Sequence, residues 1–380
     1  MSEATPSEDK SNQFSFIIHT ISLLMLVLLP PLIMPSIIRI VALLFSVDLS
    51  GLPGTAMTIL FQILLLLSYL YMSSRTQKWA IDRESLSSHG VGWSLRTWLL
   101  GYGVVVIVAL IISSFFTSSN NNQSVYDNLV SGPKDIYLLL LTAVILAPLV
   151  EELTFRKFLM DRLEFHLSGK ATIFLSALLF SMLHWLNDFL GSSPGFTASH
   201  IFSTFILGLI LGYIYQQTGN VIYSMIVHAV NNFLGFIGLI ITLLFPVTNE
   251  EFNLYAQGQS SQLSQTTLQN IHVIIITNFV LIAIGGIALL WGIVRLIRFR
   301  HQYYANLKEG IWIFISLFQP ELIYGVLYGV FSFILLPWLF ILAFEGSSSL
   351  ILRNIADMLG YVIIVAIAYY NVYMRPSLTQ

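Results

Sequence analysis

The chain has 380 residues, of which 56% are hydrophobic and only 9% are charged, whereas a typical soluble domain has about 25% charged residues. Its mean hydropathy is +0.80 and its formal net charge is −2. A soluble fold of this size could not cover so much apolar surface, and nearly neutral charge excludes the basic surface that nucleic-acid binding requires. The absence of cysteine excludes disulfides, iron–sulfur ligation and a cysteine nucleophile.

Apolar runs of about 20 residues recur along the chain, and this is the length that an α-helix needs to cross a bilayer. The expected fold class is all-α, a polytopic integral membrane protein with about ten transmembrane helices. The expected spans are 14–34, 54–74, 96–116, 135–155, 171–190, 199–217, 221–246, 271–294, 321–344 and 352–373. The first run is longer than the core of a signal peptide and has no clear cleavage site, so it is expected to remain as a span.

Lysine and arginine are unevenly distributed over the segments that connect these spans. If the N-terminus is cytoplasmic, 14 of the 17 basic residues lie on the inner side, and only Arg39, Lys134 and Arg353 lie on the outer side. The positive-inside rule predicts such a bias. Both termini are therefore expected in the cytoplasm.

Five segments follow from this division. They are a polar cytoplasmic tail (1–13), N-terminal transmembrane spans (14–134), a central segment (135–247), an extracytoplasmic loop (248–270) and C-terminal transmembrane spans (271–380). The loop is rich in Gln and Ser and contains no Lys or Arg, which agrees with an outer position. Ionisable side chains inside spans concentrate in the central segment, where they are costly and usually functional.

The first polar motif, Glu151-Glu152-Leu153-Thr154-Phe155-Arg156, lies near the inner end of the fourth span. Glu152 precedes Arg156 by four residues, which is the favourable order for an ion pair on a helix. Glu151 points about 100° away and is expected to have no local partner, as suits a general base with a raised pKa. The alternative is that both carboxylates belong to a cytoplasmic belt of charges.

The second motif places His184 four residues after Phe180 in the fifth span. At a rise of about 1.5 Å per residue, His184 lies well inside the hydrocarbon region. A single buried histidine is more often a hydrogen-bonded structural residue than a ligand. The motif alone therefore does not indicate a function.

The third motif places Asn232 four residues after His228 in the seventh span, so the two side chains share one helix face. An imidazole and an amide donor together can hold an oxyanion or a water molecule. The alternative is hydrogen bonding between helices, a common use of His and Asn in membranes. The clustering of all three motifs within roughly 80 residues favours a functional site.

In this order, the three motifs resemble those of the CPBP intramembrane proteases, also called the Abi or CAAX-prenyl-endopeptidase family. The resemblance covers roughly residues 135–247 and implies a CPBP/Abi-type catalytic core. It implies that Glu151 activates the attacking water and that His184 helps to hold it. It also implies that His228 and Asn232 stabilise the oxyanion.

The other residues of the motifs have auxiliary roles in this comparison. Glu152 is counted with the catalytic residues and forms a supporting pair with Arg156, and Phe180 is counted as a supporting residue. The resemblance leaves the cofactor open. Our expectation is none, because Glu151 can act on water directly and the chain has no His-Glu-x-x-His helix. The alternative is zinc bound by Glu151, His184 and His228.

The expected function is an intramembrane endopeptidase that cleaves a membrane-associated peptide or protein. Two other classes remain open. One is a non-proteolytic membrane scaffold or regulator, with a partner docked on the C-terminal spans; the other is a transporter, which no inverted repeat supports. Membrane lipid is an expected partner and nucleic acid is not. The expected location is a bacterial cell membrane, with the active site toward the cytoplasm.

Two further features of the sixth span matter below. His200 begins the span, and the sequence offers no partner for it. Gly208 and Gly212 have the small-residue spacing that predicts a close approach of another helix.

Overall fold

The structure is a computed structural model. It describes residues 16, 18–28, 38, 42, 45, 54–76, 87–115, 137–138, 140–164, 167–189, 194–301, 308, 327–328, 331–332 and 350–374. All regular elements among these residues are helical, which agrees with the predicted all-α class. The helices fall into two compact units, each built from separate parts of the sequence.

The first unit comprises residues 1–84, 149–176 and 304–380, and the second comprises 85–148 and 177–303. The predicted central segment, 135–247, contributes residues to both units. The two units are therefore described one at a time.

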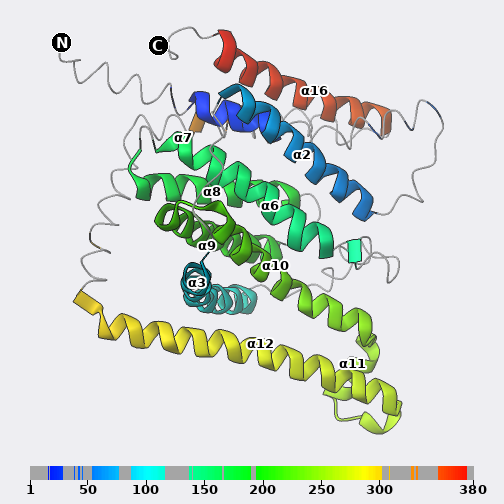
Figure 1. Cartoon of the computed structure of the whole chain (residues 1–380). Coiled ribbons are helices and arrows are strands. Elements are labelled where there is room, and N and C mark those ends of the chain that lie inside the picture. Colours follow the sequence, from blue (N-terminus) through cyan, green and yellow to red (C-terminus); the bar gives the residue numbers. More distant parts are fainter. Residues whose placement is uncertain are drawn as a thin grey trace. The chain divides into compact units, whose positions relative to one another are not determined.

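The first unit contains α2 and α16 together with the helical turns that carry the glutamate motif (Figure 1). The described elements are α2 (Gly54–Thr76), the end of α6 (Ala147–Glu152), η2 (Leu153–Met160), α7 (Asp161–Leu163), the start of α8 (Gly169–Phe189), α16 (Leu350–Tyr369) and η5 (Tyr370–Met374). Tyr69 of α2 packs edge-on against Phe158 of η2, with ring centroids 6.4 Å apart. This contact joins α2 to the turn that follows the glutamates.

The second unit is organised around α3, which contacts α9, α10 and α12 (Figure 1). Its elements are α3 (Ser88–Phe115), η1 (Leu141–Leu146), the end of α8, α9 (Pro194–Thr218), α10 (Val221–Leu244), α11 (Asn249–Ala256), η3 (Ser260–Gln262) and α12 (Gln265–Arg298). The buried core of this unit consists of Trp98, Leu207, Leu211, Ile214, Tyr223 and Val227.

A tight turn sets the start of α10 and hence the register of the third motif. Gly219 has a φ of +64°, a conformation that favours glycine, and its N–H donates to the carbonyl of Tyr215. The next residue, Asn220, caps α10 because its side-chain oxygen accepts from the N–H of Ile222 at 2.9 Å. Together these residues end α9 and begin α10 without a longer loop.

Helices α8 and α9 approach closely, as the spacing of Gly208 predicts. A Cβ atom on Gly208 would lie 2.9 Å from the Cα of Ala177. One turn further along α8, Ser181 donates to the carbonyl of Ile201 at 2.7 Å. The prediction of close helix packing is confirmed at Gly208.

Two described helices are long and apolar enough to cross a membrane, His200–Thr218 and Gln265–Arg295. Shorter apolar helices occupy Ile18–Leu28, Ile59–Tyr71, Gly169–His184, Val221–Ile237 and Val362–Val372. These seven helices overlap seven of the ten predicted spans, and α3 overlaps an eighth, 96–116. The predicted span 321–344 lies almost wholly outside the described residues, so the number of spans and their orientation remain predictions.

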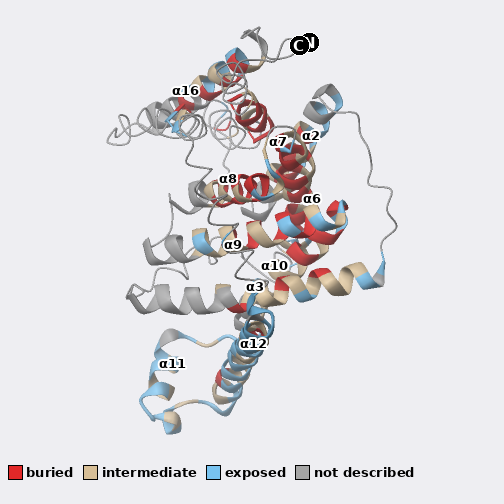
Figure 2. Cartoon of the chain, turned by 90° about the vertical axis from the view of Figure 1, so that its left-hand side faces the viewer, coloured by how far each residue is buried: buried red, intermediate tan, exposed pale blue. Residues whose placement is uncertain are grey.

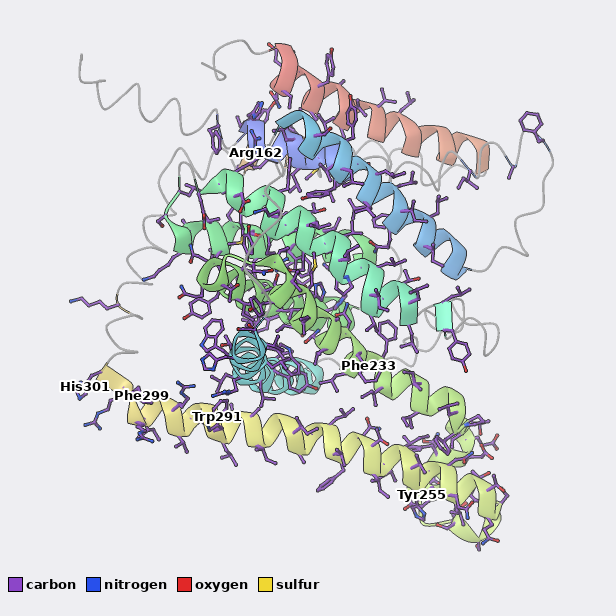
Figure 3. All side chains as sticks on the ribbon, in the orientation of Figure 1. Arg162, Phe233, Tyr255, Trp291, Phe299 and His301 are labelled. Carbon is purple, nitrogen blue, oxygen red and sulfur yellow. The ribbon has the colours of Figure 1, made fainter. Side chains whose placement is uncertain are left out.

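Helix α12 exposes a long apolar surface (Figure 2). Phe279 is 71% exposed and Ile287 is 67% exposed. At its C-terminal end, the Arg295 guanidinium lies 5.7 Å from the ring centroid of Trp291 and 5.9 Å from that of Phe299 (Figure 3). Apolar sides with an aromatic and basic end are typical of a helix that reaches a membrane–water interface.

The predicted outer loop, 248–270, contains two helical elements, α11 and η3. Thr248 and Glu251 form a capping box at the start of α11. Glu251 also accepts from the hydroxyl of Thr267 at 3.0 Å, which joins α11 to the first turn of α12. Tyr255 packs edge-on against His272, with ring centroids 5.8 Å apart (Figure 3).

Candidate functional site

The glutamate motif lies in the first unit, where α6 passes into the π-helical turn η2. The Nη1 atom of Arg156 lies 3.2 Å from the Oε1 atom of Glu152, and both side chains are fully buried. The predicted ion pair is therefore confirmed. Removing one member of such a pair would leave an uncompensated charge in a low-dielectric environment.

Glu151 is only partly buried, unlike the fully buried Glu152. Its charge nevertheless acts on Arg156. The expectation that Glu151 has no local partner is therefore wrong, because the charge of Glu151 as well as that of Glu152 acts on the buried guanidinium. Glu152 is in direct contact with Arg156, whereas Glu151 remains accessible.

The histidine motif lies in the second unit, on the part of α8 that follows Ser176. The Nδ1 atom of His184 lies 2.9 Å from the carbonyl oxygen of Phe180. A carbonyl only accepts, so Nδ1 carries the proton in this hydrogen bond. In the neutral ring, Nε2 then presents a lone pair that can accept from a water molecule.

Phe180 lies against both motif histidines. Its ring centroid is 4.6 Å from that of His184 and 5.7 Å from that of His228. Phe180 is fully buried and His228 is 2% exposed. The structure thus brings the second and third motifs together through this phenylalanine.

A third histidine joins the cluster from α9. The ring of His200 stands at 85° to that of His184, with centroids 5.6 Å apart. The hydroxyl of Thr204 donates to the carbonyl of His200 at 2.8 Å. Sequence reasoning missed this contact because His200 has no motif, and its approach to His184 depends on how α8 and α9 pack. We call Phe180, His184, His200 and His228 the histidine cluster.

Asn232 follows His228 by one turn of α10, and its amide is already engaged. The Nδ2 atom donates to the carbonyl of Ala143 in η1 at 2.9 Å. A side-chain amide has two N–H groups, so one remains for a further acceptor. This geometry is compatible with the expected role at an oxyanion.

The histidine cluster and Asn232 can therefore donate to, or accept from, a small polar group. Donors that are fixed before the reaction stabilise a developing oxyanion strongly in a dry site. The glutamates belong to the first unit and these donors belong to the second. The geometry of each set is therefore described within its own unit.

The zinc alternative would require Glu151, His184 and His228 to act as ligands together. Within the part of the chain that the structure describes, no three His, Asp or Glu side chains form a group suited to a metal ion. No step of the chemistry below is therefore assigned to a metal. The chelation experiment described below tests the zinc alternative.

The comparison with known families matches one part of the chain. Residues 133–234 match the family model described as type II CAAX prenyl endopeptidase Rce1-like. No curated protein and no solved structure matches the chain. The matched segment contains every motif residue from Glu151 to Asn232, which supports the predicted CPBP/CAAX protease resemblance. This is a family of proteases that are integral membrane proteins, in agreement with the apolar helices.

Proposed function

From the Rce1-like domain of the CAAX protease family at residues 133–234, we propose that the chain is an intramembrane endopeptidase that uses Glu151 as its general base. Its substrate is a membrane-associated peptide or protein. The observation that carries the proposal is that the matched segment contains all three motifs, including every residue that the chemistry requires.

In the proposed reaction, Glu151 takes a proton from water as the oxygen attacks the scissile carbonyl carbon. His184 accepts a hydrogen bond from that water at Nε2, because Nδ1 donates to Phe180. His228 and the second N–H of Asn232 donate to the oxyanion of the tetrahedral intermediate. The proton held by Glu151 then passes to the leaving amine, and the C–N bond breaks.

Glu152 has a different role from its neighbour in this scheme. It is fully buried and paired with Arg156, so it neutralises the guanidinium instead of reaching substrate. Glu151 is more accessible, as a residue that exchanges protons with water must be. We therefore expect the two adjacent carboxylates to differ in the effect of substitution: Glu151→Gln removes activity, and Glu152→Gln mainly removes stability.

The first test is peptide cleavage by purified protein in detergent. The probe is an internally quenched peptide that ends in a farnesylated CAAX sequence, chosen from the family description, together with a library of non-prenylated peptides. Glu151→Gln is expected to abolish cleavage while expression and unfolding stay unchanged. Glu250→Gln, an exposed carboxylate on α11, is the matched control. Cleavage by Glu151→Gln at the wild-type rate would refute the proposal.

The second test concerns the joint action of Glu151 and the histidines. Because the chain has no cysteine, the pairs Glu151→Cys with His184→Cys and Glu151→Cys with His228→Cys have no background reaction. A short bifunctional methanethiosulfonate reagent is expected to cross-link both pairs. Glu250→Cys paired with His228→Cys serves as the negative control. Equal cross-linking of control and test pairs would contradict a shared site.

The cofactor and the location are part of the same proposal. We expect cleavage to persist with a chelator, since Glu151 can activate water directly; loss with chelator and recovery with zinc would favour the zinc alternative. The proposed location is a bacterial cell membrane with the site toward the cytoplasm. A cellular phenotype that survives alanine at Glu151, His184 and His228 together would instead favour a scaffold or regulator.

A further inference from the structure

A chain of three side-chain hydrogen bonds leads to Asn232 from another helix of the second unit. The indole Nε1 of Trp98 on α3 donates to Oδ1 of Asn231 at 3.1 Å. Nδ2 of Asn231 donates to Oδ1 of Asn232 at 3.4 Å. Nδ2 of Asn232 donates to the carbonyl of Ala143 at 2.9 Å. The chain joins α3, α10 and η1.

The chemistry of the two ends fixes the direction of every bond between them. An indole N–H can only donate, so Asn231 must turn its oxygen toward Trp98. Its amide nitrogen then faces the oxygen of Asn232, and the nitrogen of Asn232 faces Ala143. A backbone carbonyl can only accept, which agrees with this direction at the far end. A flip of either amide would place two donors or two acceptors against each other.

Proline at position 148 explains why the carbonyl of Ala143 is available. In the π-helical turn η1, the N–H of Ala147 donates to the carbonyl of Thr142, five residues earlier. The same pattern would make residue 148 the donor to Ala143. Pro148 has no N–H. The amide of Asn232 thus supplies the donor that the helix itself lacks at this carbonyl.

Trp98 is held firmly enough to act as the fixed end. It is only 5% exposed, and its ring lies 5.2 Å from that of Tyr102. It belongs to the buried core that α9 and α10 share with α3. Its N–H direction is therefore set by core packing instead of by the site.

We propose that Trp98 and Asn231 are positioning residues that hold the amide of Asn232 with its nitrogen, and not its oxygen, toward the position of the oxyanion. One N–H of Asn232 is directed to Ala143, and the other is thereby oriented for the reaction. This inference rests on the proposed function, because it deepens the role given there to Asn232. It adds two residues that lie outside the three motifs.

The activity test uses Trp98→Phe, which removes the indole N–H and keeps an aromatic ring. Loss of one oxyanion donor costs about 100- to 1,000-fold in kcat, and an amide that is only misoriented part of the time should cost less. We expect kcat on the farnesylated peptide to fall about tenfold with KM nearly unchanged. Trp93→Phe is the matched control, since Trp93 lies on the same helix and packs against Tyr213.

A double-variant cycle separates positioning from a general structural defect. If Trp98 acts through Asn232, then Trp98→Phe should change kcat very little in a protein that already carries Asn232→Ala. A tenfold loss in both backgrounds would show that the indole acts elsewhere and would overturn the inference.

Asn231→Asp provides a variant that leaves the core residue intact. A carboxylate can still accept from Trp98, but it presents an oxygen, not an N–H, to Asn232. Asn232 should then turn its nitrogen toward position 231 and its oxygen toward Ala143. We expect a larger fall in kcat than for Trp98→Phe. Wild-type kcat in Asn231→Asp would contradict the proposal.

The last arm does not depend on activity. In protein labelled with ¹⁵N-asparagine, the side-chain NH₂ signals of Asn231 and Asn232 can be assigned by their loss in Asn231→Asp and Asn232→Ala. We expect Trp98→Phe to shift or broaden the Asn232 signal, and Trp93→Phe to leave it unchanged. An Asn232 signal that is the same in Trp98→Phe and wild type would overturn the inference. If no peptide is cleaved but the Asn232 signal changes in Trp98→Phe, the proposed function is contradicted, whereas the hydrogen bonds that link Trp98 to Asn232 are supported.

Discussion

Adding one methyl group at Gly208 should force α8 and α9 apart. The Cβ atom of an alanine there would lie 2.9 Å from the Cα of Ala177 and 3.0 Å from its Cβ. Carbon atoms in favourable contact are about 3.5–4.0 Å apart, so the helices must separate by roughly 0.6 Å or more. The nearest obstacle is backbone, which cannot rotate away as a flexible side chain can.

Excess volume in a well-packed core typically costs about 1–3 kcal/mol. We expect Gly208→Ala to lower the free energy of unfolding by about that amount. Gly235→Ala on α10 is the matched control, because a Cβ there meets no atom within 4 Å. Alanine is favoured over glycine in helices by up to about 1 kcal/mol, so the control should be neutral or slightly stabilising.

The assay is unfolding of purified protein in detergent by a titration with SDS, followed by tryptophan fluorescence. Ala177→Gly combined with Gly208→Ala should recover only part of the loss, because the Cα of residue 177 remains in place when its Cβ is removed. Equal stability of Gly208→Ala and Gly235→Ala would refute the close packing of α8 and α9 on which the position of His200 depends.

Three further predictions concern single contacts. Glu152→Gln should lower the free energy of unfolding by about 3–5 kcal/mol, because it leaves Arg156 charged and buried, and Arg156→Leu in addition should recover much of this loss in the SDS titration. His200→Phe should retain more peptide cleavage than His200→Ala, because phenylalanine keeps an aromatic ring packed against His184. Hydrogen bonds from Thr248 hold the pKa of Glu251 below its usual value, so the stabilisation of the 248–270 segment is present above pH ~4.5 and lost as pH falls through the lower folded-state pKa. Hydrogen exchange followed by mass spectrometry should show that protection of that segment is lost in acid. Thr248→Val should weaken this pH dependence without abolishing it, because the N–H of residue 248 and the hydroxyl of Thr267 still donate to Glu251; a pH dependence as strong as in the wild type would contradict the assignment.

Local sequence signals predicted the features that neighbouring residues determine. The i, i+4 spacing of Glu152 and Arg156 predicted their ion pair, since one helical turn places such side chains together. The capping box of Thr248 and Glu251 carries an equally local signal, a Thr followed three residues later by a Glu. It could have predicted α11, but the polar composition of 248–270 was used only to predict a loop outside the membrane.

Features that depend on two or more helices could not be predicted from spacing. Trp98 and Asn231 are 133 residues apart, and their hydrogen bond exists only because α3 packs against α10. The approach of His200 to His184 likewise depends on the close packing of α9 on α8 at Gly208. Glu151 was expected to lack a partner because helical spacing pairs Arg156 with Glu152, whereas in the structure the charge of Glu151 also acts on Arg156.

By itself, the sequence determined the membrane class, the all-helical fold and the identity of the motif residues, because hydrophobicity, helical spacing and residue chemistry are properties of short segments. Only the tertiary structure decided which way Asn232 presents its amide and which additional residues surround His184. An amide orientation is set by the partners at both of its ends, and those partners come from helices that are distant in sequence and meet only when the chain is folded.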